Sequence, residues 1–129
     1  MTPLLFVGVA LAGGVGAGLR WTADMLLSRV LPRGFPWAIL IVNATGSLAL
    51  GLLTGLALDQ VWLAILGTGL LGGYTTFSTV AVDTQLLVRH GRSEAAWANA
   101  LGTLILCVAA AMAGLALGWA LTAGFTARP

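Results

Sequence analysis

The third apolar segment of the chain contains the sequence GTGLLGGYTTFST at residues 67–79. Two adjacent glycines weaken a helix at Gly72-Gly73, and four hydroxyl side chains follow within the five residues 75–79. A lone Ser or Thr in a membrane helix bonds back to an earlier carbonyl. This cluster beside a glycine pair instead favours a broken helix whose free carbonyls suit a cation such as Na⁺ and whose hydroxyls suit a small anion. A simple packing kink would produce the same pattern.

The composition places the chain in a membrane. Of its 129 residues, 59% are hydrophobic and 8% are charged, against roughly 25% charged residues in a soluble domain. Such a chain lacks the polar surface of a globular protein and is too hydrophobic for a disordered one. Six arginines, no lysine and a net charge of +2 form no basic stripe for nucleic acid.

Short polar breaks at residues 29–34, 59–60 and 89–94 divide the chain into four apolar segments. The segments cover residues 4–27, 37–58, 61–88 and 95–123, and each reaches the roughly 20 residues that a membrane helix needs. Strands are excluded because the apolar runs do not alternate and an open sheet is not stable in lipid. We therefore predict an all-α integral membrane protein, one domain over residues 1–129, with the first segment retained and the third helix broken near the membrane midplane.

The arginines indicate an orientation. Arg29, Arg33, Arg89 and Arg92 lie in the two loops at one side, with Arg20 nearby, whereas the side of the termini carries only Arg128. Under the positive-inside rule the arginine-rich side is cytoplasmic.

Small and aromatic residues fit helices packed in a bilayer. The five tryptophans lie near predicted span ends, as in an interfacial aromatic belt. Glycines recur at four-residue spacing, which allows helix backbones to approach closely within one subunit or across a dimer: Gly14/Gly18, Gly51/Gly55, Gly69/Gly73 and Gly114/Gly118. The single cysteine, Cys107, is interpreted as a packing residue.

Catalysis has little support. The four carboxylates are isolated near span ends, the one histidine, His90, lies in a loop, and no metal-ligand cluster or nucleophile–base pair is visible. We therefore expect a protein that is not an enzyme.

Polar residues inside the spans are the better candidates. Asn43 is costly in an apolar helix unless it pairs with another helix or lines a site. Arg20 either snorkels to the interface or sets a positive potential at an anion vestibule. In the fourth segment Asn99 and Thr103 lie one turn apart on one face, with Cys107 a turn further on.

Three motifs together resemble the CrcB/Fluc family of small membrane fluoride channels. They are GAGLRW at residues 16–21, VNATGS at residues 42–47 and GGYTTFST at residues 72–79. The third is highly specific, and the length and the four spans agree over essentially the whole chain.

The resemblance implies an antiparallel, dual-topology dimer in a prokaryotic cell membrane, with two pores that export fluoride passively. It implies a Na⁺ ion at the dimer interface, held by backbone carbonyls of Gly72 and Thr75. Phe77 would turn its positive ring edge to fluoride, Asn43 would line the pore, and Arg20 would set the vestibule potential. The remaining pore candidates are Thr76, Ser78, Thr79 and Thr103.

The chain departs from the family pattern at three points. Val80 stands where the family usually has a second phenylalanine, and Asn99 where it often has tyrosine. The arginine bias is strong for a protein that inserts in both orientations. The chain is thus either a homodimer or one half of a heterodimer with a paralogous subunit.

Two other membrane proteins remain as alternatives. A non-conducting scaffold subunit would explain Val80 and the arginine bias. A multidrug-type exporter is disfavoured because the only acid of the first span, Asp24, lies near its end.

Overall fold

The computed structural model describes residues 2–126, with side chains to residue 124, and this part of the chain is helical without strands. The elements are α1 (Pro3–Val30), α2 (Trp37–Gly55), α3 (Gln60–Trp62), η1 (Leu63–Leu71), α4 (Gly72–Tyr74), α5 (Phe77–Arg89) and α6 (Ser93–Thr126). α3, η1, α4 and α5 together make the third span, which is bent by 19°. In the described residues four helices are long and apolar enough to cross a membrane, which confirms the predicted fold class.

Local chemistry sets the helix ends. The Thr2 hydroxyl accepts the Leu5 N–H at 3.3 Å, and Pro3 occupies the first position of α1, where a proline costs no hydrogen bond. α2 ends at Gly55, before the predicted end at residue 58, because the chain turns there and Ala57 adopts a positive φ of 51°. The Asp59 carboxylate then caps α3 by accepting the N–H groups of Val61 (2.9 Å) and Trp62 (3.1 Å).

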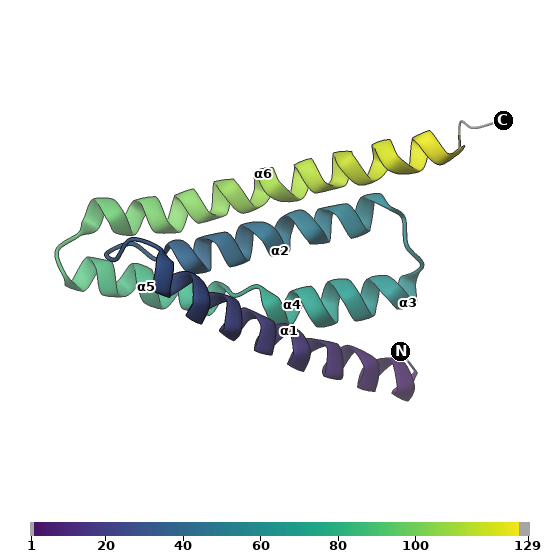
Figure 1. The fold of residues 1–129 in the computed structure, drawn as a ribbon, viewed down its shortest axis with the longest axis horizontal. Coiled ribbons are helices and arrows are strands. Elements are labelled where there is room, and N and C mark those ends of the chain that lie inside the picture. Colours follow the sequence, from purple (N-terminus) through teal and green to yellow (C-terminus); the bar gives the residue numbers. More distant parts are fainter. Residues whose placement is uncertain (1, 127–129) are drawn as a thin grey trace.

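Glycine contacts join α2 to α6. A Cβ on Gly51 would collide with the Ala111 carbonyl oxygen, and one on Gly114 would collide with that of Leu48. Gly55 and Gly118 face each other in the same contact. These two predicted glycine pairs therefore pack within one chain, and Figure 1 shows α2 running alongside α6.

The two halves of the third span pack on different helices. η1 and α4 lie against α1, whereas α5 lies against α6. In the first contact a Cβ on Gly73 would collide with the Gly13 carbonyl, and one on Gly16 with the Leu70 carbonyl. Gly14 and Gly18 have no such neighbour in the described structure.

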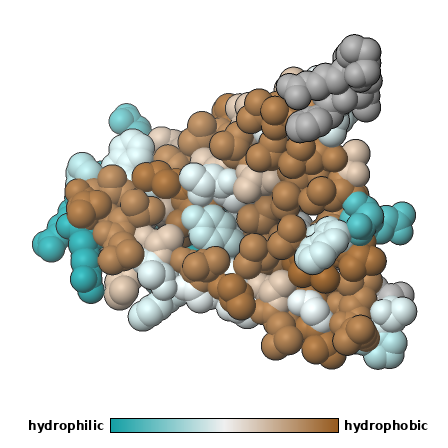
Figure 2. Space-filling model, turned by 45° about the vertical axis from the view of Figure 1, so that its right-hand side comes forward, coloured by the Kyte–Doolittle hydropathy of each residue, from teal (hydrophilic) through white to brown (hydrophobic). Residues whose placement is uncertain are grey.

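The surface is apolar between polar ends (Figure 2). All five tryptophans are exposed on it. The loop after α1 and the loop before α6 meet at one end, where the Arg92 guanidinium donates to the Gly34 carbonyl (Figure 1). Arg29, Arg33, Arg89 and Arg92 gather at this end, while Arg128 lies outside the described residues. The structure thus keeps the arginine asymmetry on which the predicted orientation depends.

Candidate functional site

The third span breaks two residues after its glycine pair. Gly72 and Gly73 remain helical in α4, and the chain becomes extended at Thr75 (φ −84°, ψ 158°) and Thr76 (φ −150°, ψ 127°) before α5 begins. Ahead of the break, η1 has wider π-helical turns, in which the Gly72 N–H donates to the Gly67 carbonyl. π-helical hydrogen bonding is rare, and here it extends over the nine residues of η1, so the approach to the break departs from regular α-helix.

Asn43 of α2 stabilises the break. Its Oδ1 accepts the Thr76 N–H at 2.7 Å and its Nδ2 donates to the Thr76 carbonyl at 2.9 Å. Asn43 is only 6% exposed, so an unpaired carboxamide would be costly. The Asn43 side chain instead bonds to both the N–H and the carbonyl of Thr76, in place of the helical partners that this extended residue lacks.

Gly46 lets α2 approach the break. A Cβ at this position would collide with the Thr75 side chain and meet the Tyr74 ring at 3.0 Å. The Thr45 hydroxyl lies 3.3 Å from the Tyr74 hydroxyl in the same contact. The asparagine motif of residues 42–47 is therefore the surface of α2 that faces the break.

The break leaves carbonyls without their helical donors. The Thr76 N–H, which would bond to the Gly72 carbonyl in a continuous helix, bonds to Asn43 instead. The Thr79 N–H, which would bond to the Thr75 carbonyl, lies 3.4 Å from the Thr76 hydroxyl. The Gly73 carbonyl accepts from Arg20 Nε at 3.4 Å. Arg20 of α1 thus contacts the main chain of α4 just before the break.

The N-terminus of α5 carries a group of hydroxyls. The Thr76 hydroxyl lies 3.1 Å from that of Ser78 and 3.3 Å from that of Thr79. Free N–H groups and the helix dipole make a helix N-terminus attractive to anions. The two sides of the break therefore have opposite character: carbonyls of α4 suit a cation, and N–H and hydroxyl groups of α5 suit an anion.

A groove of about 580 Å³ opens beside the break, and we call it the break groove. α2, the break and α6 supply its polar lining residues, whereas Val80 and two leucines of α6 are among its apolar ones. Phe77, which is 83% exposed, lies at its edge. The groove is lined by Asn43, Ser47, Gly72, Thr75, Thr76, Phe77, Val80, Ala100, Leu101, Thr103, Leu104 and Cys107.

Thr103 is the unusual member of this lining. It is 6% exposed, and its hydroxyl is the one buried side-chain oxygen or nitrogen of the described residues without a hydrogen-bond partner. A buried hydroxyl without a partner is destabilising. Thr103 lines the break groove, but its hydroxyl is covered in the single chain, so it could meet an ion only if neighbouring side chains move.

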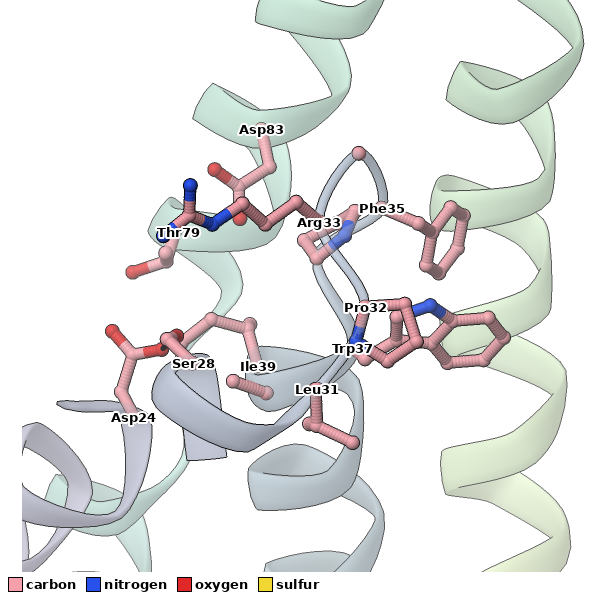
Figure 3. Close-up of a pocket in the computed structure, with 13 residues that line it drawn as sticks. Asp24, Ser28, Leu31, Pro32, Arg33, Phe35, Trp37, Ile39, Thr79 and Asp83 are labelled. Carbon is pink, nitrogen blue, oxygen red and sulfur yellow. Dashed lines mark hydrogen bonds between the residues drawn. The ribbon is translucent and has the colours of Figure 1, made fainter. Parts of the chain in front are cut away.

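A second pocket, of about 380 Å³, lies at the arginine-rich end and is shown in Figure 3. Arg33 from the loop after α1 reaches toward Asp83 and Thr79 of α5, and Asp24 and Ser28 of α1 lie across from them. We call this the Arg33 pocket. Thr79 lines it, while Thr76, whose hydroxyl touches that of Thr79, lines the break groove. The Thr76 and Thr79 hydroxyls therefore lie between the break groove and the Arg33 pocket.

The structure gathers most of the candidate residues from the sequence. Asn43, Gly72, Thr75, Thr76, Phe77 and Thr103 line the break groove, and Ser78 and Thr79 extend its hydroxyl group toward the Arg33 pocket. Arg20 lies apart, on the Gly73 carbonyl and outside the lining of either space.

Several lining residues were not among the candidates. Arg33, Asp24, Ser28 and Asp83 line the Arg33 pocket, and Ser47 and Cys107 line the break groove. Helical spacing is the signal that could have found them, because Ser47 follows Asn43, Cys107 follows Thr103 and Asp83 follows Thr79 by four residues.

Side-chain metal ligands are not grouped in the described residues: no three of His, Cys, Asp and Glu come together.

Known proteins resemble this chain over most of its length. Residues 7–115 match the profile of the family described as CrcB-like protein, Camphor Resistance (CrcB). The chain is 44% identical over 122 residues to "Fluoride-specific ion channel FluC 1" of Leifsonia xyli, covering 92% of this chain and 89% of that one. It is 42% identical over 114 residues to "Fluoride-specific ion channel FluC 2" of Mycobacterium tuberculosis, covering 88% and 90%.

A third relative, "Fluoride-specific ion channel FluC 1" of Symbiobacterium thermophilum, is 43% identical over 120 residues, covering 88% of this chain and 97% of that one. Four apolar spans and bacterial relatives make the chain a multi-pass protein of a prokaryotic cell membrane. The family match includes parts of all four spans and both sides of the break, and the chain belongs to the CrcB family.

Proposed function

We propose that this protein is a fluoride-specific ion channel, not an enzyme, through which fluoride leaves the cytoplasm passively. The observation that carries the proposal is identity of 42–44% to proteins named fluoride-specific ion channels, over about nine-tenths of both chains. The geometry of the break groove supports it, because the groove combines hydroxyls, a helix N-terminus and an exposed aromatic edge without a basic side chain in its lining.

In this proposal the chain's own groups replace the hydration shell of fluoride. The N-terminus of α5 supplies a positive potential, and the hydroxyls of Thr76, Ser78, Thr79 and Thr103 offer donors along the groove and toward the Arg33 pocket. The ring edge of Phe77 carries the positive rim of its quadrupole. Arg20 sets the potential of the vestibule, and Arg33 adds positive charge at the arginine-rich end.

A Na⁺ ion fits the other side of the break. The carbonyls of Gly72 and Thr75 lose their helical N–H donors to Asn43 and to the Thr76 hydroxyl, and carbonyl oxygens are suitable ligands for a small hard cation. Gly72 is exposed and lines the break groove. Bound Na⁺ would neutralise these oxygens and fix the two helix ends relative to each other.

The proposed channel is an antiparallel dimer whose pores lie between the subunits. Phe77 is 83% exposed and the break groove is open at its side, so a second copy would close the groove and supply the other carbonyls around Na⁺. We favour a homodimer because most of the motif set is present in this chain. A paralogous subunit of opposite orientation is the alternative that the arginine asymmetry supports.

Acid chemistry gives such a channel a use. Hydrogen fluoride is a weak acid that crosses membranes as a neutral molecule and ionises in a less acidic cytoplasm. The inside-negative potential then drives the trapped anion outward by about 2.3 kcal/mol per charge per 100 mV. A passive pore therefore suffices for export, without a nucleotide site.

Reconstitution tests the proposal. The purified chain alone is placed in liposomes loaded with potassium fluoride or potassium chloride, valinomycin releases the counter-ion, and ion-selective electrodes follow efflux. We expect fluoride efflux without chloride efflux. A folded dimer without flux would refute the self-sufficient homodimer and favour the heterodimer, whereas a folded monomer without flux would favour a scaffold subunit.

A further inference from the structure

The ring of Phe77 has little support of its own. It is 83% exposed, so the position of the ring depends on the backbone of the first turn of α5. This turn runs from Thr76 to Val80, and Asn43 holds its beginning by two hydrogen bonds to Thr76. A helical turn held at one end can still pivot about that end, so the contacts at Val80 decide where the ring lies.

Asn99 of α6 holds the other end of the turn. Its Nδ2 donates to the Thr84 hydroxyl at 2.9 Å and to the Val80 carbonyl at 3.3 Å. The Thr84 hydroxyl itself donates to the Val80 carbonyl at 2.7 Å. Asn99 is 2% exposed, so water does not compete for these bonds. The three groups form a closed triangle between α5 and α6.

The carboxamides of Asn43 and Asn99 thus bond to the same helical turn of α5 from two different helices. Asn43 reaches it from α2 and Asn99 from α6. Val80, whose carbonyl accepts from Asn99, is itself buried. Phe77 is the one aromatic residue among the groove's described lining residues, and the hydrogen bonds of Asn99 tie α5 to α6 here.

We propose that Asn99 is a positioning residue for the ion path: through Val80 and Thr84 it sets the position of the first turn of α5 and hence of the Phe77 ring. The inference rests on the proposed function, and it adds a residue that does not touch the ion. Asn99 itself is outside the lining of the break groove, so it acts through α5.

Fluoride flux in three variants forms the first arm of the test. Asn99→Leu keeps the volume and removes the donors, and Thr84→Val removes the main acceptor with a smaller change. Thr54→Val is the matched control, since Thr54 bonds only back to the Leu50 carbonyl of its own helix. We expect flux to fall about tenfold or more in Asn99→Leu, because displacements near 1 Å at a tuned site have effects of this size. Thr84→Val should fall less, and Thr54→Val should match the wild type.

A spectroscopic arm separates positioning from stability. All phenylalanines are replaced by 4-fluorophenylalanine, and loss of a line in Phe77→Leu assigns the ¹⁹F signal of residue 77. We expect Asn99→Leu and Thr84→Val to shift or broaden this line in the folded protein while the line of Phe6 stays fixed. A residue that only stabilises the fold would lower the melting temperature and leave the folded-state line unchanged.

The outcomes are distinct from those of the proposed function. If the wild-type chain conducts no fluoride, the proposed function fails whatever residue 99 does. If the wild type conducts and Asn99→Leu conducts equally with an unchanged Phe77 line, the positioning role is wrong. Should Asn99→Leu fail to fold, Thr84→Val decides by the same two measurements.

Discussion

The two halves of the third span are held in the membrane by different means. The half before the break, η1 and α4, packs on α1 through glycines at which any side chain would strike a backbone carbonyl. The half after the break, α5, is held by the carboxamides of Asn43 and Asn99. Steric contact needs no polar atoms, whereas the asparagine contacts leave carbonyls, hydroxyls and a helix N-terminus beside the break groove.

The difference shows how a small membrane protein separates the part that gives it rigidity from the part that keeps polar groups for an ion. Lipid tails are as apolar as leucine side chains, so close backbone packing is the available source of rigidity for the first half. The second half must keep polar groups available to an ion, and each buried polar group there needs a partner. The break allows one span to satisfy both demands, because the chain changes its neighbour from α1 to α6 at that point.

The largest effect should come from damage to the glycine-packed half. In Gly16→Val, the new side chain would collide with the Leu70 carbonyl and crowd the Tyr74 N–H. Overpacking of this kind costs about 3 kcal/mol or more where backbone must move. We expect little or no monodisperse protein after detergent extraction, measured by size-exclusion chromatography.

Gly14→Val is the control for this change, because a Cβ at that position would have no atom of another helix within 4 Å. It should yield folded protein at the wild-type level. A Gly16→Val protein that extracts and melts like the wild type would contradict the steric account of the first half.

The next largest effect is on transport alone. Phe77→Ile removes the ring edge but little packing, since the side chain is 83% exposed. We expect fluoride efflux from liposomes to be abolished while the elution volume and melting temperature stay at wild-type values. Phe6→Ile, an exposed phenylalanine of α1, is the control and should conduct normally; wild-type flux in Phe77→Ile would remove Phe77 from the ion path.

Asn43→Ala should affect both stability and transport, because Asn43 bonds to Thr76 at the break and also lines the break groove. It leaves the Thr76 N–H and carbonyl without partners, at a cost of about 1–3 kcal/mol for each group that stays dry. We expect a lower melting temperature and fluoride flux reduced by about 10- to 100-fold. Thr54→Ala, elsewhere on α2, should change neither quantity much. Unaltered flux in Asn43→Ala would show that the break does not depend on this carboxamide.

Hydropathy alone predicted the four spans, because burial in lipid acts on whole segments. The position of the break was less accessible: the glycine pair suggested residues 72–73, yet α4 continues through them and the chain opens at Thr75 and Thr76. The reason is a contact 33 residues away in sequence, Asn43 with Thr76, which no local pattern contains. For the same reason glycine spacing could not tell that Gly69/Gly73 pack on α1 while Gly14/Gly18 stay open.

The Arg33 pocket illustrates the same limit. Its residues come from α1, the following loop and α5, and Figure 3 shows that the loop carries Arg33 over to α5. The family resemblance implied a vestibule charge for Arg20, whose guanidinium lies 3.4 Å from the Gly73 carbonyl. It did not indicate Arg33, because the approach of this loop residue to α5 depends on tertiary packing.

Thr103→Val is the smallest change, and it separates a polar group that serves stability from one that serves the ion. Valine has nearly the shape of threonine, so only the buried hydroxyl without a partner is lost. Removing an unsatisfied buried hydroxyl should leave stability unchanged or raise it by about 1 kcal/mol, whereas fluoride flux should fall several-fold if the hydroxyl contacts the ion. Thr22→Val, which loses only a bond to the Gly18 carbonyl of its own helix, controls for the loss of a hydroxyl. A Thr103→Val protein that melts at a lower temperature with unchanged flux would mean that the Thr103 hydroxyl serves stability and not transport. Lower flux with undiminished stability would mean that this polar group is retained for the ion rather than for the fold.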